Sequence, residues 1–210
     1  MFYKIVRWIV ACGSAGVYRV RIRGRDLLPA TGGYVLAPSH RSMMDIPFAA
    51  WLTTRELRYM GKASLFRIPV LGAAFRNLGG FEVARDGTDR KALRDSMEML
   101  RNGEILLLYP EGTRQHGPKI QALQPGAAYL ALRAGVPIVP VGIAGSEEIL
   151  RDHDSHIPRF KPVAIVVGEP IVGERRETGV VPREQVDALT ARLHDALQVV
   201  LDEAYELRES

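Results

Sequence analysis

Short apolar runs alternate with longer segments of helical spacing along the 210 residues of this chain. Residues 104–109 form the clearest apolar run, and residues 182–207 form the longest segment with one apolar face. Short apolar runs bounded by turn residues are typical of buried strands, whereas apolar residues three and four positions apart are typical of helices. The alternation therefore predicts an α/β domain with a mixed, mostly parallel central sheet that is flanked by helices.

The individual elements follow from the same patterns. The predicted strands cover residues 17–23, 34–37, 57–60, 80–83, 104–109, 137–143 and 163–167. The predicted helices cover residues 44–52, 86–100, 126–134 and 182–207, and shorter helices are expected within residues 63–78. A chain of this length can bury one sizeable core, so residues 19–210 are expected to form a single layered domain.

The charge balance is basic, with a net charge of +4 and an isoelectric point of about 9.4. Such a balance suits anionic partners: nucleic acid, acidic lipid or phosphorylated metabolites. The sequence contains no P-loop, no Rossmann glycine fingerprint and no aromatic RNA-binding motif, so we expect no nucleic-acid partner. Cys12 is the only cysteine, which excludes an intrachain disulfide and a cysteine-based zinc site.

The N-terminal residues carry a pattern of their own. Phe2 to Tyr18 are mostly apolar or aromatic, with Lys4 and Arg7 near the start. No uncharged run reaches the roughly 18 residues needed to span a bilayer. Apolar bulk flanked by cations is typical of a helix that lies on an anionic membrane surface. We therefore predict a membrane-associating amphipathic helix over residues 1–18, with a first core helix whose ends are solvated as the alternative.

His40 and Asp45 follow the predicted strand 34–37 in the run SHRSMMD. A neutral imidazole is a good base near neutral pH, and a carboxylate can hold its tautomer. Positions i and i+5 of one helix point about 140° apart. The two side chains can therefore meet only if His40 lies on the turn before a helix and Asp45 lies inside it. Taken alone, the spacing favours the alternative of a surface histidine and a helix N-terminal acid that never meet.

The neighbouring serines are weaker candidates for chemistry. Ser39 and Ser42 flank His40, but neither stands in the G-x-S-x-G pattern of a nucleophile elbow. Serine at such a position more often caps a helix. His40 is therefore expected to activate a substrate hydroxyl directly, without a covalent enzyme intermediate.

A second polar turn, Glu111-Gly112-Thr113-Arg114, follows the predicted strand 104–109. Gly112 lets the backbone come close to a ligand, and Arg114 offers a planar fork of donors suited to phosphate oxygens. Glu111 is a candidate partner for Arg114 or for a substrate hydroxyl. Arg85, after the predicted strand 80–83, is a second candidate cation. Taken singly, a polar β-turn explains the first segment and a solvated charge explains Arg85.

Together these segments resemble the glycerophospholipid acyltransferase family, with bacterial 1-acyl-glycerol-3-phosphate acyltransferases as the closest members. Four blocks match the family in order, within about residues 20–170. They are H-x4-D (His40 to Asp45), a glycine-led run closed by arginine (Gly79 to Arg85), E-G-T-R (Glu111 to Arg114) and V-P-I-V-P (Val136 to Pro140). Four ordered blocks are far more specific than any one of them, so the resemblance overrides the alternatives that each block leaves open.

The resemblance implies an acyl thioester donor, either acyl-CoA or acyl-carrier protein, and a lysophospholipid acceptor, with no metal and no cofactor. It implies that His40 is the general base and that Asp45 orients it. It implies that Pro140 is structural and places its strand beside the donor. The residues that it assigns to the acceptor's phosphate and to the support of that turn are Arg85, Glu111, Gly112, Thr113 and Arg114.

The expected protein is thus an acyltransferase that acylates the free hydroxyl of 1-acyl-glycerol-3-phosphate and makes phosphatidic acid. The basic N-terminus adds an anionic membrane surface as partner and the cytoplasmic face of the cell membrane as location, with peripheral or monotopic attachment. Two alternatives stay open: an acyltransferase for another lysophospholipid or a glycolipid, and a non-catalytic protein that binds anionic membranes.

Overall fold

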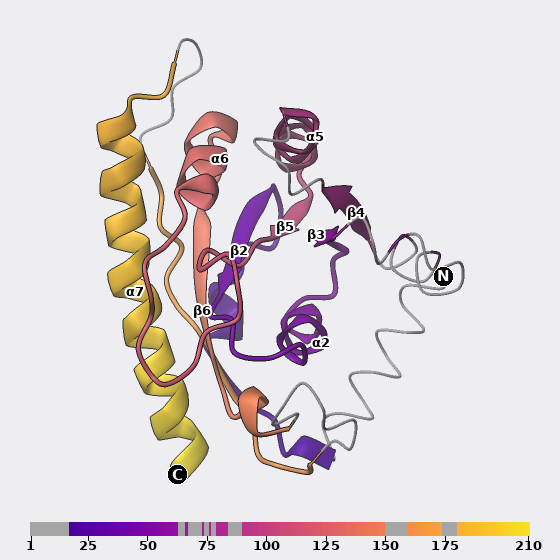
Figure 1. Ribbon diagram of the computed structural model, residues 1–210, viewed down its shortest axis with the longest axis vertical. Coiled ribbons are helices and arrows are strands. Elements are labelled where there is room, and N and C mark those ends of the chain that lie inside the picture. The colour runs from indigo at the N-terminus through magenta and orange to yellow at the C-terminus, as the bar shows by residue number, and fades with distance from the viewer. Residues whose placement is uncertain are drawn as a thin grey trace.

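The computed structural model describes residues 17–62, 79–83, 90–149, 159–173 and 180–210, together with the single positions 66, 73 and 76. Within this part of the chain, seven strands form one sheet with helices around it (Figure 1). The strands are β1 (Arg21–Arg23), β2 (Tyr34–Pro38), β3 (Leu57–Lys62), β4 (Gly80–Val83), β5 (Ile105–Leu107), β6 (Ile138–Ala144) and β7 (Ala164–Val167). The helices are α2 (Asp45–Trp51), α5 (Arg90–Arg101), α6 (Gly126–Ala134) and α7 (Arg183–Glu209), with short 3₁₀ helices η1 (Arg25–Leu27) and η2 (Ser146–Glu148).

The strand order is β1-β7-β6-β2-β5-β3-β4. The five neighbouring strands from β6 to β4 run parallel to one another. β7 is antiparallel to β6, and β1 is parallel to β7, so the sheet is mixed. The predicted α/β domain with a mostly parallel sheet is therefore confirmed. Because parallel strands end at a common edge, the loops after β6, β2 and β5 begin side by side.

The helices form layers on the two faces of the sheet, and β2 shows why. Successive side chains of a strand point to opposite faces. Tyr34 and Leu36 pack in a buried cluster with α2, whereas Val35 and Ala37 pack in a second cluster with α6 and the first half of α7. The second half of α7 covers β6 and β7 in a third cluster. β2 is thus buried on both faces, which places the chain that follows it at a rigid point of the domain.

One predicted strand starts later than expected. Residues 17–23 were predicted to be extended, but residues 17 and 18 are helical and β1 begins only at Arg21. Arg19 has a positive φ of 44°, which interrupts the extended backbone. Tyr18 instead turns into the core, where its ring meets that of Phe48 edge-on with centroids 5.8 Å apart.

Three further predictions concern helices. The helix predicted over residues 126–134 is confirmed at both ends, and it stops at Gly135 with a φ of 71°, which glycine adopts without strain. The helices expected within residues 63–78 and the membrane helix over residues 1–18 lie almost entirely outside the described residues. Among the described residues, no helix is both long enough and apolar enough to cross a bilayer.

Pro140 lies buried in the middle of β6, where a missing backbone N–H needs an explanation. Val141 pairs with Val167 of β7, and the next bridge on this side joins Ile138 to Ile171. Between these two pairs, the chain that faces β6 has three residues where β6 has two. One extra residue on one side of a strand pair defines a β-bulge. Proline is tolerated at bulges because the ladder is already interrupted there. The Pro140 carbonyl still accepts a hydrogen bond of 2.9 Å from the N–H of Gly168.

Candidate active site

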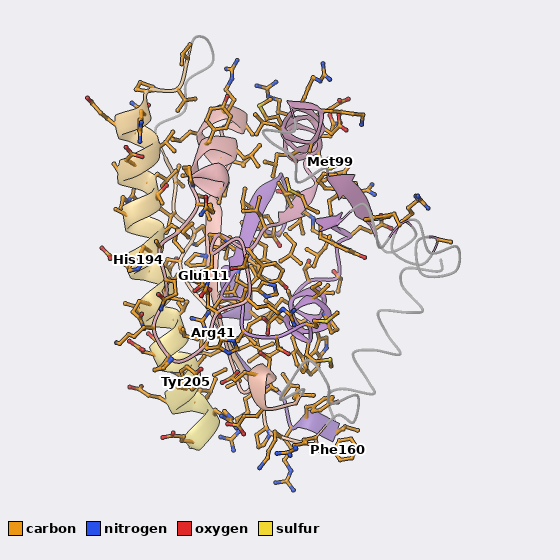
Figure 2. All side chains as sticks on the ribbon, viewed as in Figure 1. Arg41, Met99, Glu111, Phe160, His194 and Tyr205 are labelled. Atoms are coloured by element: carbon orange, nitrogen blue, oxygen red, sulfur yellow. The ribbon has the colours of Figure 1, made fainter. Side chains whose placement is uncertain are left out.

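Three loops meet at the carboxyl edge of the sheet. His40 follows β2, Glu111 follows β5 and Ser146 follows β6, and these strands are parallel neighbours in the order β6-β2-β5. Residues far apart in the sequence are therefore gathered at one place. Figure 2 shows Arg41 and Glu111 close together in this region, in the middle of the molecule between α7 and α2.

His40 and Asp45 contact each other as their spacing requires. The imidazole Nδ1 of His40 lies 2.9 Å from the carboxylate Oδ2 of Asp45. α2 begins at Asp45, and His40 lies on the turn before it, so the predicted geometry of the pair is confirmed. Because a carboxylate can only accept a hydrogen bond, Nδ1 carries the hydrogen, and the lone pair of the neutral ring is on Nε2. Among the described residues, no group hydrogen-bonds to Nε2, and the side chain of His40 is 15% exposed.

The Asp45 carboxylate is buried and held by three further donors. Its Oδ2 accepts hydrogen bonds from the backbone N–H groups of Arg41, at 2.7 Å, and Ser42, at 2.8 Å. Its Oδ1 accepts a hydrogen bond from the hydroxyl of Ser146. Four donors fix the carboxylate in one orientation, so the imidazole that rests on it is oriented as well.

Tyr109 packs on the face of the His40 ring. The two ring centroids are 3.9 Å apart and the planes differ by 21°, which is a stacked arrangement. The Tyr109 hydroxyl oxygen is buried and has no hydrogen-bond partner among the described residues. Burial and the nearby Asp45 carboxylate raise the pKa of this phenol well above its usual value, so the hydroxyl stays neutral. The stacking leaves the imidazole little freedom to rotate.

Glu111 is buried, and its carboxylate holds Arg41 rather than Arg114. Nη1 of Arg41 donates to Oε1 at 3.0 Å and to Oε2 at 2.8 Å. The backbone N–H groups of His40, at 3.0 Å, and Gln121, at 3.1 Å, complete the set of donors. Glu111 therefore ties its own turn to the residue that carries the imidazole.

The rest of the E-G-T-R turn faces solvent. Gly112, Thr113 and Arg114 are exposed, and Gly112 has a positive φ of 73°. The next residue, Gln115, donates its N–H to the carbonyl of His40 at 2.8 Å, so the turn starts and ends against the His40 backbone. Within the described part of the chain, the guanidinium of Arg114 makes no hydrogen bond or ion pair. An unpaired guanidinium on a turn that is bonded to the His40 backbone suits an anionic group on a substrate.

The two remaining predicted site residues are not brought into this cluster. Arg85 lies outside the described residues, so its role stays a prediction. Pro140 pairs with Ala37 of β2, three residues before His40, and contributes to the site only through the position of the strands. Its proposed relation to the acyl donor also stays a prediction.

Sequence reasoning missed three residues of the cluster. Arg41 stands beside His40 in the same motif, and its charge was a usable signal, although nothing in the sequence names its partner. Tyr109 stands beside the E-G-T-R turn, but its stacking on the imidazole depends on the folded structure. Ser146 is 101 residues from Asp45, and no sequence pattern connects the two.

The sequence profile of the acyltransferase family matches residues 19–144, which include His40, Asp45 and the turn from Glu111 to Arg114. The chain belongs to the acyltransferase family. The resemblance carried by the four sequence blocks is thereby confirmed at the level of the family. The match starts before β1 and ends with β6, so it spans most of the sheet.

Individual acyltransferases with similar sequences come from distant organisms. The chain is 32% identical over 163 residues to a 1-acyl-sn-glycerol-3-phosphate acyltransferase of Chlamydomonas reinhardtii, which covers 75% of this chain and 48% of that protein. It is 24% identical over 181 residues to the enzyme of the same name from Bacillus subtilis, covering 85% of this chain and 86% of that one. The chain spans about half the length of the chloroplast and algal relatives that it matches.

A solved structure has the same fold. The 1-acyl-sn-glycerophosphate acyltransferase PlsC from Thermotoga maritima superposes with a TM-score of 0.74, covering 99% of this chain and 82% of that one. The two sequences are 24% identical, so the likeness concerns the fold. It agrees with the α/β fold class predicted from the alternating pattern.

Proposed function

We propose that this acyltransferase transfers a fatty acyl group from a thioester donor, acyl-CoA or acyl-carrier protein, to the free hydroxyl of 1-acyl-glycerol-3-phosphate. The product would be phosphatidic acid. The observation that carries the proposal is the His40–Asp45 pair with its free Nε2, together with the exposed, unpaired Arg114 on a turn whose next residue is bonded to the His40 backbone. A base and an anion-binding group at the same edge of the sheet suit an acceptor that carries both a hydroxyl and a phosphate. The names of the relatives support the same acceptor.

The chemistry follows from the position of the free nitrogen. Nε2 of His40 takes the proton of the acceptor hydroxyl as its oxygen attacks the thioester carbonyl carbon, and the new C–O bond forms. The tetrahedral intermediate then collapses, the C–S bond breaks, and the imidazolium returns its proton to the departing thiolate. During these steps the Asp45 carboxylate stabilises the positive charge on the ring.

The acceptor's phosphate would be held by the exposed half of the E-G-T-R turn. Arg114 supplies a fork of donors, Thr113 supplies a hydroxyl, and Gly112 brings the backbone close without a side chain. Because Gln115 is bonded to the His40 carbonyl, the phosphate and the reacting hydroxyl would be held at a fixed separation.

The proposal is tested by replacing the base. His40→Ala is expected to lower the rate of thiol release from acyl-CoA in the presence of lysophosphatidate by roughly 10²- to 10⁴-fold. His194→Ala, on the outer side of α7, serves as the matched control. A folded His40→Ala protein with a rate close to that of the wild type would refute the role of His40. Rapid turnover of another lysophospholipid or of a glycolipid, but not of lysophosphatidate, would establish the alternative acceptor.

We also propose that the protein works at the cytoplasmic face of the cell membrane, as a peripheral or monotopic protein. The basic and apolar residues 1–18 support this location. So does Phe160, which is 73% exposed between the exposed cations Arg159 and Lys161 and protrudes from the end of the molecule shown at the bottom of Figure 2. Its ring lies 6.2 Å from that of Tyr18, the last residue of the predicted segment 1–18. An exposed aromatic flanked by cations suits an anionic lipid surface.

Membrane attachment is tested with vesicles of phosphatidylglycerol and phosphatidylcholine. Phe160→Ala is expected to weaken sedimentation with anionic vesicles by about tenfold, because burying a Phe side chain contributes ~1.5–3 kcal/mol. Val180→Ala is the control. Val180 is 89% exposed but lies just before the start of α7, which is at the top of Figure 1, whereas Phe160 is at the bottom of Figure 2. Equal binding of all three proteins would exclude Phe160 from the contact, and no binding by the wild type would contradict the membrane location.

A further inference from the structure

Arg41 is a fully buried cation whose three nitrogens all donate hydrogen bonds. Its side chain is 0% exposed, as is that of its ion-pair partner Glu111. Nε donates to the carbonyl of Gly117 at 3.0 Å, and Nη2 donates to the carbonyl of Lys119 at 3.1 Å. Nη1 donates to both carboxylate oxygens of Glu111 and to the carbonyl of His40 at 3.2 Å. One guanidinium therefore holds groups from three separate stretches of chain.

These stretches are the parts of the proposed site. Arg41 belongs to the turn that carries His40, Glu111 opens the E-G-T-R turn, and residues 117–119 belong to the loop that follows Arg114. The proposed phosphate-binding residues thus lie between two points that Arg41 holds, one on each side. Their separation from the imidazole therefore depends on the bonds of this side chain, together with the backbone bond from Gln115 to the His40 carbonyl.

A fully buried ion pair such as Arg41–Glu111 is unusual, and its presence needs an explanation. Moving two charges out of water costs several kcal/mol each, and an apolar pair of the same volume is often as stable. Here every nitrogen of the guanidinium and both oxygens of the carboxylate have hydrogen-bond partners, and such a polar network holds one arrangement more rigidly than an apolar contact. The loop has a second anchor on the far side, where Gln198 of α7 accepts from the N–H of Ile120 at 2.9 Å and donates to the carbonyl of Pro118 at 3.1 Å. Arg41 is therefore not the sole attachment of the loop.

We propose that Arg41 is a positioning residue that sets the distance between the His40 imidazole and the phosphate-binding turn. This inference rests on the proposed function, because it needs an acceptor whose phosphate and hydroxyl are bound at once. The Arg41–Glu111 pair also neutralises the Glu111 carboxylate, which would otherwise repel the acceptor's phosphate. A lysine cannot replace the arginine, since an ammonium lacks the planar fork that reaches three directions.

The test measures kcat and KM for lysophosphatidate in Arg41→Lys, together with KM for the acyl donor. A displaced turn is expected to raise KM for the acceptor by about tenfold while KM for the donor stays within about twofold. A variant that is only less stable has fewer active molecules, which lowers the apparent kcat and leaves KM unchanged. Thermal unfolding, followed in parallel, gives the folded fraction. An unchanged acceptor KM would overturn the proposal.

A double variant guards against a loss that comes only from a poorly filled core. Arg41→Met with Glu111→Leu removes both charges and keeps the site filled with apolar volume, which proteins often tolerate. The proposal expects this variant to keep the raised acceptor KM, because the bonds to Gly117, Lys119 and His40 are gone. Recovery of the wild-type KM would show that the pair only fills space.

Arg55→Lys is the matched control. Arg55 also ties backbone segments together, donating to the carbonyls of Pro29, at 3.1 Å, Gly32, at 2.6 Å, and Gly103. Gly32 and Gly103 precede β2 and β5, so these bonds lie at the opposite edge of the sheet. Arg55→Lys is expected to lower stability without changing either KM, and a rise in acceptor KM equal to that of Arg41→Lys would count against the proposal. An inactive wild type would reject the proposed function itself, which is a separate result.

Discussion

Asp45→Asn isolates the charge of the carboxylate from its hydrogen bonds. An amide oxygen in place of Oδ2 can accept the same N–H groups from Arg41, Ser42 and His40, and an amide nitrogen in place of Oδ1 can donate to the Ser146 oxygen once that hydroxyl turns. The fold therefore keeps its contacts and loses only the negative charge. Asp45 is fully buried, so water cannot replace the stabilisation that this charge gives the imidazolium.

The expected loss follows from Coulomb's law. During the reaction the imidazole becomes an imidazolium, and since its Nδ1 lies 2.9 Å from Oδ2, the two charge centres are about 4 Å apart. At an effective dielectric constant of about 20 this attraction is worth ~4 kcal/mol. Since each 1.36 kcal/mol changes a rate tenfold, kcat should fall by about 10³-fold. The Tm is expected to fall by no more than about 5 °C, because the hydrogen bonds remain, although as neutral ones.

The assay is continuous detection of free thiol released from acyl-CoA, with lysophosphatidate as acceptor and the wild type measured alongside. Asp187→Asn, an exposed carboxylate on α7 that pairs with Arg183, is the control and should leave kcat unchanged. A folded Asp45→Asn enzyme that keeps more than about a tenth of the wild-type kcat would refute the reasoning. The carboxylate would then act only as a hydrogen-bond acceptor.

Substitutions at two further positions probe the groups of the candidate site. Arg114→Ala should raise KM for lysophosphatidate by about tenfold or more, because a bond to a charged group contributes ~1.5–3 kcal/mol, and an equal loss with an acceptor that lacks phosphate would contradict phosphate binding. Tyr109→Phe should keep the stacking and be at least as stable as the wild type in thermal unfolding, since it removes a buried hydroxyl that has no partner among the described residues. Tyr109→Leu should lower kcat, and a lower kcat in Tyr109→Phe as well would show instead that the hydroxyl takes part.

Once the resemblance paired His40 with Asp45, their arrangement was predictable because helix geometry leaves one solution. Their spacing of five places one of them outside the helix, and a carboxylate is favoured in the first turn of a helix. The structure has this arrangement, with α2 starting at Asp45. The partner of Glu111 was not predictable in the same way. Arg114 is three residues away in the sequence, yet the carboxylate binds Arg41, which is 70 residues away.

The alternation of apolar runs and amphipathic segments determined the α/β class by itself. A strand that is buried on both faces is apolar throughout, whereas a helix that is buried on one face has apolar residues three and four positions apart. It also placed the chemical groups after strands, where loops are free to carry them. The tertiary structure alone decided which charges became partners at the carboxyl edge of the sheet. Arg41, Glu111 and Ser146 meet there because β2, β5 and β6 lie side by side, and strand order depends on how whole layers pack rather than on any local pattern.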